Sequence, residues 1–237
     1  MGVVLGFVSG KGGMGTTALC AGVAVALAQS GKTVLCIDCH DGMGDLGCYL
    51  GLGKMPDLTY WDVCRGDYAL EQAASHPEFP HLRFLAAPLR VMPVEKAAVS
   101  ALVEGAKEKF DFVLLDRPEI ICPSHTYLLV THATMPAIAG ARRMADNLQL
   151  QGAENVRLLV NAVDTRQMAA MKLTVDDVID QVGVSLLGVV PQQDAVSMAA
   201  FREQSLISYT KKGAAAACLR IAERLQGKSV RIPGRLI

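Results

Sequence analysis

Near its N-terminus the chain reads Gly10-Lys11-Gly12-Gly13-Met14-Gly15-Thr16-Thr17. This glycine-rich stretch follows an apolar run at residues 3–8 and precedes a helix-like run at residues 18–28. Glycines let the backbone turn its N–H groups toward anionic oxygens, and the N-terminus of the following helix adds partial positive charge. The sequence therefore predicts a phosphate-binding loop between a strand and a helix.

The spacing within this loop departs from the usual phosphate-binding pattern at one position. That pattern has Gly, four residues, then Gly-Lys-Ser/Thr. Here Gly10 and Gly15 keep the glycine spacing, Thr16 replaces the lysine, and an earlier lysine, Lys11, is present. The arrangement resembles the deviant Walker A loop of the MinD/ParA family of P-loop ATPases, Lys-Gly-Gly-x-Gly-Lys-Thr, at every position but one.

The resemblance implies roles for the residues of the loop. In the family the early lysine, here Lys11, acts in catalysis by reaching the phosphates of a nucleotide in a partner subunit, which implies a nucleotide-dependent homodimer. The lysine that neutralises phosphates in its own subunit falls on Thr16. The residues expected to bind ATP or ADP in the loop are Gly10, Gly12, Gly13, Met14, Gly15, Thr16 and Thr17.

Length and composition fit one domain spanning residues 1–237. Of these residues 51% are hydrophobic and 19% charged, which is enough apolar material for a large core. No apolar segment reaches the ~18 residues needed to span a bilayer. The N-terminus lacks the basic, apolar and small-residue series of a signal peptide. We therefore expect a cytoplasmic protein, with thiol rather than disulfide cysteines.

Apolar runs alternate with helix-like segments along the rest of the chain. The runs are continuous, which is typical of strands covered on both faces in a parallel sheet. This order predicts an α/β fold with a doubly wound, mostly parallel sheet flanked by helices, as in P-loop NTPases of the MinD type. We expect strands at residues 3–9, 33–39, 82–87, 110–116, 127–131, 157–161 and 185–190, and helices at 17–29, 70–74, 94–109, 137–150, 175–182, 195–203 and 214–226.

Acidic residues end two of the predicted strands. Asp38 and Asp116 each follow an apolar run, where a carboxylate can hold the water shell of Mg²⁺ or orient an attacking water. With the Thr17 hydroxyl they are the expected Mg²⁺ ligands, partly through water. The resemblance also implies a catalytic role for Asp38, beside that of Lys11.

Two residues at this acidic edge depart from the family. The family's Asp-x-Asp begins at Asp38, but its second acid, which positions water, falls on His40. Asp41 could substitute, although strand geometry directs it to the opposite side, and His40 could equally be a loop residue without a role. In the family's Asp-x-Pro-x-Gly, which begins at Asp116, Glu119 replaces the glycine that faces the terminal phosphate. Because an acid there would repel phosphate, we expect Glu119 to face solvent.

Two later strand ends resemble base-binding segments of the family. Asn161 ends a predicted strand, and its counterpart hydrogen-bonds the base; an Asn that only terminates a strand is the alternative. Pro191 lies in a segment similar to the family's base-flanking Gly-x-x-Pro. Asn161 and Asp164 also have the spacing of guanine-specific Asn-Lys-x-Asp, but Ala162 replaces that lysine. ATP or ADP with Mg²⁺ is therefore the expected ligand.

The C-terminal part, from about residue 211, is basic. From residue 205 onward seven basic residues accompany one acid, a local charge of +6 from seven minus one, although the whole chain balances 23 against 23. Gly227, Pro233 and Gly234 interrupt the segment, which disfavours an amphipathic membrane helix. A peripheral position at the inner membrane surface, contact with nucleic acid and a solvated surface stay open. The overall balance argues against a specific nucleic-acid partner.

Two functions fit this sequence. The first is a MinD/ParA-like ATP-binding switch, weak or defective in hydrolysis, that regulates the positioning of cell division, chromosomes or appendages with an unknown regulatory protein partner. The second is a non-catalytic structural or partner-docking module that has lost nucleotide turnover. Lys11, Thr17 and the two strand-end acids favour the first, whereas Thr16 and His40 favour the second. Cys36 and Cys39 form a Cys-x-x-Cys whose first member lies in an apolar strand, so ordinary packing is favoured over a metal site.

Overall fold

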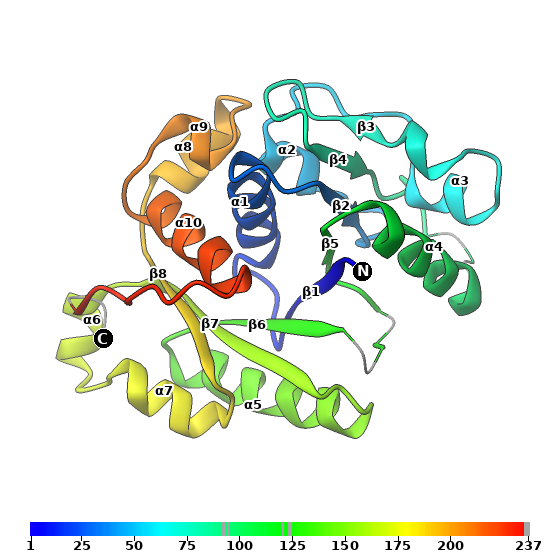
Figure 1. The fold of residues 1–237 in the computed structure, drawn as a ribbon. Coiled ribbons are helices and arrows are strands. Elements are labelled where there is room, and N and C mark those ends of the chain that lie inside the picture. Colours follow the sequence, from blue (N-terminus) through cyan, green and yellow to red (C-terminus); the bar gives the residue numbers. More distant parts are fainter. Residues whose placement is uncertain (92, 94, 120, 123–124, 235–237) are drawn as a thin grey trace.

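A twisted sheet forms the centre of the computed structural model, which describes residues 1–91, 93, 95–119, 121–122 and 125–234 (Figure 1). The strand order is β3-β4-β2-β5-β1-β6-β7-β8. Within these described residues, every neighbouring pair is parallel except β3 and β4. The strands are β1 Val3–Ser9, β2 Val34–Asp38, β3 Ala74–Ser75, β4 Leu82–Leu85, β5 Phe112–Asp116, β6 Thr126–His132, β7 Asn155–Val163 and β8 Leu186–Pro191.

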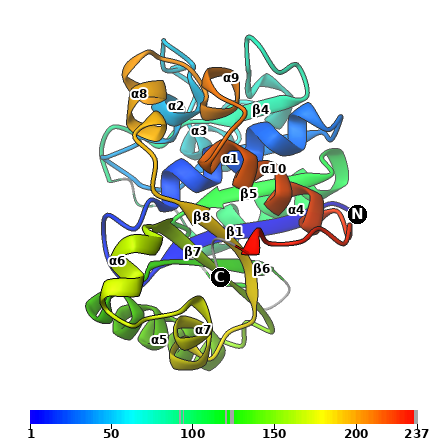
Figure 2. The ribbon, with the colours of Figure 1, turned by 90° about the vertical axis from the view of Figure 1, so that its left-hand side faces the viewer.

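Helices cover both faces of this sheet. Figure 2 shows α1 on one side of the central strands and α5 and α7 on the other. The helices are α1 Thr16–Gln29, α2 Leu46–Leu50, α3 Tyr60–Cys64, α4 Lys96–Lys109, α5 Met135–Leu150, α6 Thr165–Ala170, α7 Val175–Val182, α8 Ala195–Phe201, α9 Leu206–Tyr209 and α10 Ala214–Leu225. The predicted doubly wound α/β fold is confirmed.

Strand β1 illustrates why an unbroken apolar run is needed. Successive side chains of a strand point to opposite faces. Leu5 and Phe7 pack in the core under α1 and α10, whereas Val4 packs with α4 and Val8 packs with α5. Both sets are buried, so a polar residue on either face would have no access to water. The central strands therefore meet their helices on both sides.

One predicted helix was wrong. Residues 70–74 form a single 3₁₀ turn, Leu70–Gln72, and Ala74 already belongs to β3. β3 pairs antiparallel with β4, and the Arg83 guanidinium of β4 donates to the Ala73 carbonyl at 3.0 Å. Pairing with the neighbouring strand thus outweighs the helix propensity of so short a segment. The predicted helix start at Val94 lies outside the described residues, and α4 begins at Lys96.

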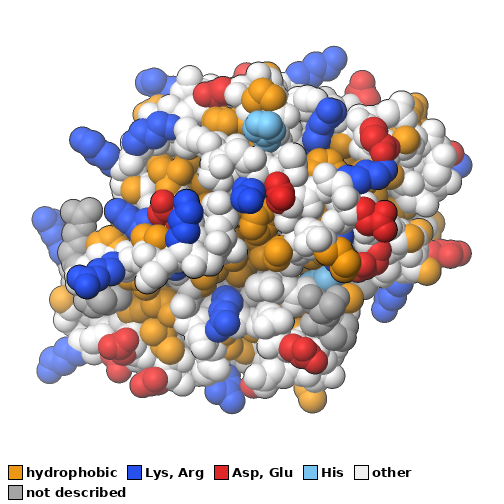
Figure 3. Space-filling model, viewed as in Figure 1, with side chains coloured by type: hydrophobic (Ala, Val, Ile, Leu, Met, Phe, Trp, Pro, Cys, Tyr) orange, Lys and Arg blue, Asp and Glu red, His pale blue; other side chains and the backbone are white. Residues whose placement is uncertain are grey.

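The basic C-terminal segment does not present all of its charge to solvent. Figure 3 shows Lys and Arg side chains gathered over the left of the face seen in Figure 1, where α10 and the C-terminal end lie. Arg224 is different: it donates to the carbonyls of Leu187 (2.6 Å) and Val230 (2.9 and 2.7 Å). Arg224 thus joins the segment after α10 to β8. In the part of the chain that the structure describes, no helix has the length and apolarity to cross a membrane.

Candidate nucleotide-binding site

The glycine-rich loop joins β1 to α1 at the carboxyl edge of the sheet. Gly13 and Gly15 both have φ of +78°, the left-handed region that glycine adopts without strain. Gly15 is also the N-cap of α1; it has no side chain to accept from the first helical N–H groups, and the first turn of this described helix contains no acid. These N–H groups and the positive end of the helix dipole are therefore available to an anion.

Neighbouring elements hold the loop in shape. A Cβ on Gly10 would lie 2.1 Å from the Gly140 carbonyl oxygen of α5, so only glycine fits this close approach. Asn161 at the end of β7 donates its side-chain N–H to the Met14 carbonyl at 2.9 Å. The Ser9 hydroxyl donates to the Lys11 carbonyl, also at 2.9 Å. The loop is thus held by α5 and β7, which are far from it in sequence, and by Ser9 at its own start.

Thr16 and Thr17 lie in the first turn of α1 but have different surroundings. Thr16 is fully buried, and its hydroxyl oxygen has no hydrogen-bond partner among the described residues. The Thr17 hydroxyl donates to the Asp116 carboxylate at the end of β5. The position at which related loops carry a lysine therefore provides no charge, while the neighbouring threonine is already joined to an acid.

Two buried carboxylates end adjacent strands. Asp38 of β2 and Asp116 of β5 are register partners. Asp38 accepts hydrogen bonds from the backbone N–H groups of His40 and Leu46, each at 3.0 Å. Burial raises the pKa of both carboxyls, and that of Asp116 reaches about 7 because Asp38 adds a like charge while the Thr17 hydrogen bond only partly opposes the shift.

These groups fit a magnesium ion accompanied by phosphate. Asp116 keeps one buried oxygen without a partner among the described residues, and Thr17 adds a hydroxyl beside it. No group of three His, Cys, Asp or Glu side chains within the described ranges could hold a metal. Mg²⁺ binds through one or two protein oxygens together with water and phosphate oxygens, so these few ligands are sufficient only when a nucleotide supplies the rest.

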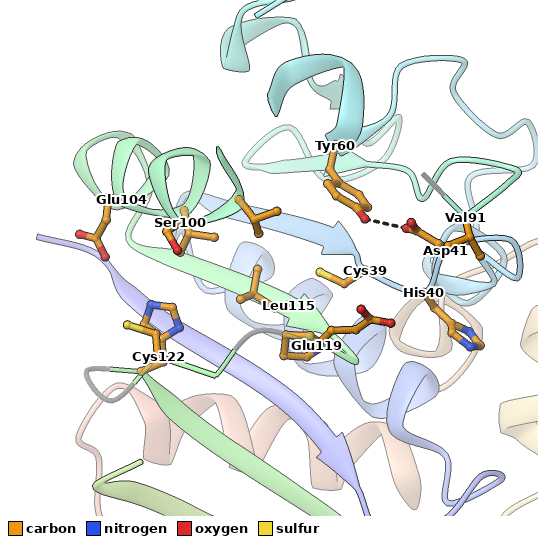
Figure 4. A pocket seen from close by; sticks show the side chains of 14 residues that line it. Cys39, His40, Asp41, Tyr60, Val91, Ser100, Glu104, Leu115, Glu119 and Cys122 are labelled. Atoms are coloured by element: carbon orange, nitrogen blue, oxygen red, sulfur yellow. Dashed lines mark hydrogen bonds between the residues drawn. The ribbon is translucent and has the colours of Figure 1, made fainter. Parts of the chain in front are cut away.

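His40 and Glu119, the two departures from the family near the buried acids, and the neighbouring Asp41 have different surroundings. The Arg117 guanidinium lies 3.4 Å from the ring nitrogens of His40. Asp41 accepts from the Tyr60 hydroxyl of α3 at 2.6 Å, as Figure 4 shows, so its carboxylate is engaged with α3. Because β2 ends at Asp38, this placement comes from the contact with Tyr60 and not from continued strand geometry. Glu119 is exposed, which confirms the expectation that it faces solvent.

A cavity of about 330 Å³ adjoins these loops (Figure 4). Its walls come from α4 and from the segments that follow β2 and β5, with Tyr60 at one end and His125 among the lining residues. Burial lowers the pKa of His125, and neither ring nitrogen has a partner among the described residues. No sequence motif surrounds this histidine, so its place in the cavity could not be predicted from the sequence.

The predicted site residues fall into three groups. The loop residues other than Lys11, the acids Asp38 and Asp116, and Asn161 are brought together at the carboxyl edge of the sheet. Pro191 ends β8 at the same edge, paired with Val163 of β7. Lys11 is exposed, and none of the ion pairs between described residues includes it.

This loop, in this sheet, gives the chain the fold of the P-loop NTPases. The pattern of the CobQ/CobB/MinD/ParA nucleotide binding domain matches residues 5–207, so the chain belongs to the MinD/ParA family. Septum site-determining protein MinD of Synechocystis sp. is 28% identical over 238 residues, covering 94% of this chain and 88% of that protein.

Solved structures give the same relationship. The MinC:MinD cell division protein complex of Aquifex aeolicus contains a chain that is 26% identical, with a TM-score of 0.89 and coverage of 98% of both chains. The septum site-determining protein MinD of Pyrococcus horikoshii, solved as a complex with Mg-ADP, shares the fold with a TM-score of 0.78 at 24% identity, covering 95% of this chain and 96% of that one.

Proposed function

We propose that this chain is a MinD-like ATP-binding switch that is weak or defective in hydrolysis. The proposal rests on the different surroundings of Thr16 and Thr17, two neighbouring residues in the first turn of α1. Thr17 and Asp116 keep the arrangement that a Mg²⁺-nucleotide requires, whereas Thr16 is buried where the family has a lysine. Binding depends largely on backbone groups and Mg²⁺, but the transfer step depends on cations around the terminal phosphate.

ATP and ADP are the proposed ligands, and residues 1–237 act as one domain in binding them. The anion side of the ligand meets the loop and the N-terminus of α1. Asn161 and Pro191 lie at the ends of β7 and β8, on the side where the base would extend. Asn161 already donates one N–H to Met14, so it supports the loop as well as flanking the base.

Nucleotide-linked dimerisation is the proposed output. Lys11 is exposed, has no ion-pair partner among the described residues, and leaves the loop beside Gly140 of α5. A partner subunit that covers this face would receive the Lys11 ammonium at its own nucleotide. Similar proteins are named for septum-site determination and for a complex with MinC. Positioning of division, or of another cell structure, from the cytoplasm or the inner membrane surface is therefore the proposed role, with an unidentified regulatory protein as partner.

A non-catalytic docking module is the second candidate. His40 and Glu119 stand where the family has an acid and a glycine, and both departures lie in segments expected to respond to the terminal phosphate. As a docking module, the chain would bind a partner protein at the carboxyl edge of the sheet and would not hydrolyse ATP.

Calorimetric titration with ATP and ADP, each with Mg²⁺, tests the proposal. We expect both nucleotides to bind, with hydrolysis close to background. Thr17→Ala should weaken Mg²⁺-dependent binding, and Thr165→Ala, a matched change at the exposed first residue of α6, should not. Absence of heat and of any thermal shift at millimolar nucleotide would leave only the docking module.

A further inference from the structure

We propose that Arg117 replaces the missing loop lysine and binds the terminal phosphate of ATP. The inference rests on the proposed nucleotide binding and adds the residue that supplies the lost charge. Arg117 is the residue after Asp116, between the predicted Mg²⁺ ligand and Pro118. No motif of the family assigns a cation to this position, so the sequence pattern alone gives no role to the side chain.

The backbone at Arg117 places its side chain against the phosphate loop. Arg117 has φ of +53°, a left-handed conformation that is uncommon for a residue with a Cβ. Its N–H donates to the Phe7 carbonyl of β1 at 3.0 Å, which fixes the chain at the end of β5 beside the strand that leads into the loop. A strained conformation of this kind persists only where the surrounding structure holds it.

Arg117 and Lys11 line the same hollow, of about 300 Å³. The other walls include the backbone of Ser9, Gly10 and Gly12, and none of the described lining residues is acidic. Inner phosphates bind at the helix N-terminus, and the lysine of an ordinary loop reaches the β- and γ-phosphates. The hollow lies along residues 9–12 of the loop. Arg117 directly follows Asp116, whose expected Mg²⁺ would bridge the β- and γ-phosphates, so a phosphate beyond that ion would come within reach of the Arg117 side chain.

The Arg117 guanidinium makes few contacts with the described residues. Its buried Nε has no partner among the described residues, no ion pair within the described ranges includes it, and one terminal nitrogen reaches the His40 ring only at 3.4 Å. Arg224 provides a comparison, since Nε and both of its terminal nitrogens donate to carbonyls at 2.6–2.9 Å. Arg224 is a structural arginine, whereas Arg117 retains donors for a phosphate.

A purely electrostatic role toward Asp116 is the competing account. The charge of Arg117 lowers the pKa of Asp116, although less than burial raises it. In that role Arg117 would affect Mg²⁺ binding with ATP and ADP alike. A contact with the terminal phosphate would affect ATP alone.

The test compares ATP and ADP affinities, by calorimetry with Mg²⁺, for the wild type, Arg117→Gln and Arg117→Lys. Both variants keep a long side chain at the same backbone conformation, and only the second keeps the charge. We expect Arg117→Gln to weaken ATP roughly tenfold to hundredfold, the size of a lost charge-assisted hydrogen bond, and to change ADP little. Arg117→Lys should recover much of the loss. Arg157→Ala, an exposed arginine in β7, is the control and should match the wild type.

A second experiment asks whether Arg117 and the loop lysine are interchangeable. In a Thr16→Lys background, Arg117→Gln should cost much less ATP affinity than it does in the wild type, and melting curves report whether each variant is folded. Equal losses for ATP and ADP, or an unchanged ATP affinity in folded Arg117→Gln, would overturn the inference. If the wild type binds neither nucleotide, it is the proposed function that fails.

Discussion

The proposed weakness in ATP hydrolysis depends on Thr16. Its hydroxyl is buried without a described partner, and it offers no cation where negative charge develops in phosphoryl transfer. We expect Thr16→Lys to raise ATP hydrolysis by roughly tenfold or more, and Thr16→Lys with His40→Asp to raise it further. Phosphate release with Mg²⁺ is the measurement.

Thr165→Lys is the matched control for this change, because Thr165 is also the first residue of a helix but is exposed on α6. It adds the same charge away from the loop and should leave hydrolysis unchanged. If the wild type already hydrolyses ATP as fast as ordinary ATPases of the family, Thr16 does not weaken hydrolysis.

The raised pKa of Asp116 predicts that nucleotide binding and protein stability change with pH in opposite directions. Its pKa rises from 3.8 to about 7 in the folded protein, so between these values the folded state holds a proton that the unfolded chain has released. Stability of the unliganded protein should therefore fall as pH rises through this range. Mg²⁺ requires the carboxylate, so nucleotide affinity should rise about tenfold from pH 6 to pH 8.

Melting temperatures of the unliganded protein between pH 3.8 and about pH 7 test the trend in stability. Calorimetric affinities for the nucleotide at pH 6 and at pH 8 test the trend in binding. Asp116→Asn, which cannot ionise, should be less sensitive to pH in its stability, with a residual slope from Asp38, whose pKa burial also raises. Parallel pH profiles for stability in Asp116→Asn and the wild type would contradict the assignment.

Some site residues follow from sequence motifs and others only from the fold. The glycine spacing predicts the loop, and an apolar run ending in an acid predicts Asp38 and Asp116. The Asn161 contact with Met14 requires β6 and β7 to lie beside β1, and the position of Arg117 depends on its left-handed backbone. Neither feature leaves a spacing in the chain that could be recognised beforehand.

Among the helices and strands, long buried elements could be predicted from the sequence and short ones could not. All seven predicted strands are present, with ends that shift by a few residues, because strands buried on both faces require continuous apolar runs. The helices α2, α3, α6 and α9 were missed. Each has only four to six residues, too few for a helical period to be recognised. β3 was also missed, since two residues carry no pattern of their own.

Helix packing predicts opposite effects for the same substitution in two helices. Gly105 in α4 has open space around a built Cβ, so Gly105→Ala should stabilise the protein by about 0.5–1 kcal/mol. Gly22 in α1 approaches α10, where a Cβ would lie 2.7 Å from the Cys218 sulfur. Gly22→Ala should therefore destabilise by about 1–3 kcal/mol. Urea unfolding of both variants measures the change in the free energy of unfolding. Equal changes in the two variants would contradict the close packing of α1 on α10.

Over the whole molecule, the candidate site residues gather at one edge of the sheet. The carboxyl edge of the sheet carries the loop, both buried acids and Arg117. The basic C-terminal segment is partly committed to structure, since Arg224 joins β8 to the segment after α10 and Ile232 packs against the core between the sheet and α5 and α7. The loop face is therefore the better candidate for self-association than the C-terminal segment.

Self-association through this face should depend on Lys11 and on ATP. Lys11 is exposed and lies beside Gly140 at the rim of the hollow that it shares with Arg117, so its ammonium can reach a second subunit without breaking an ion pair described in its own. Sedimentation with and without ATP should show a nucleotide-promoted dimer for the wild type and a monomer for Lys11→Ala. Lys32→Ala, at the amino end of β2 and thus at the opposite edge of the sheet, should behave as the wild type. Identical profiles for wild type and Lys11→Ala would mean that Lys11 acts only within its own loop, and the chain would then be a monomeric binding module.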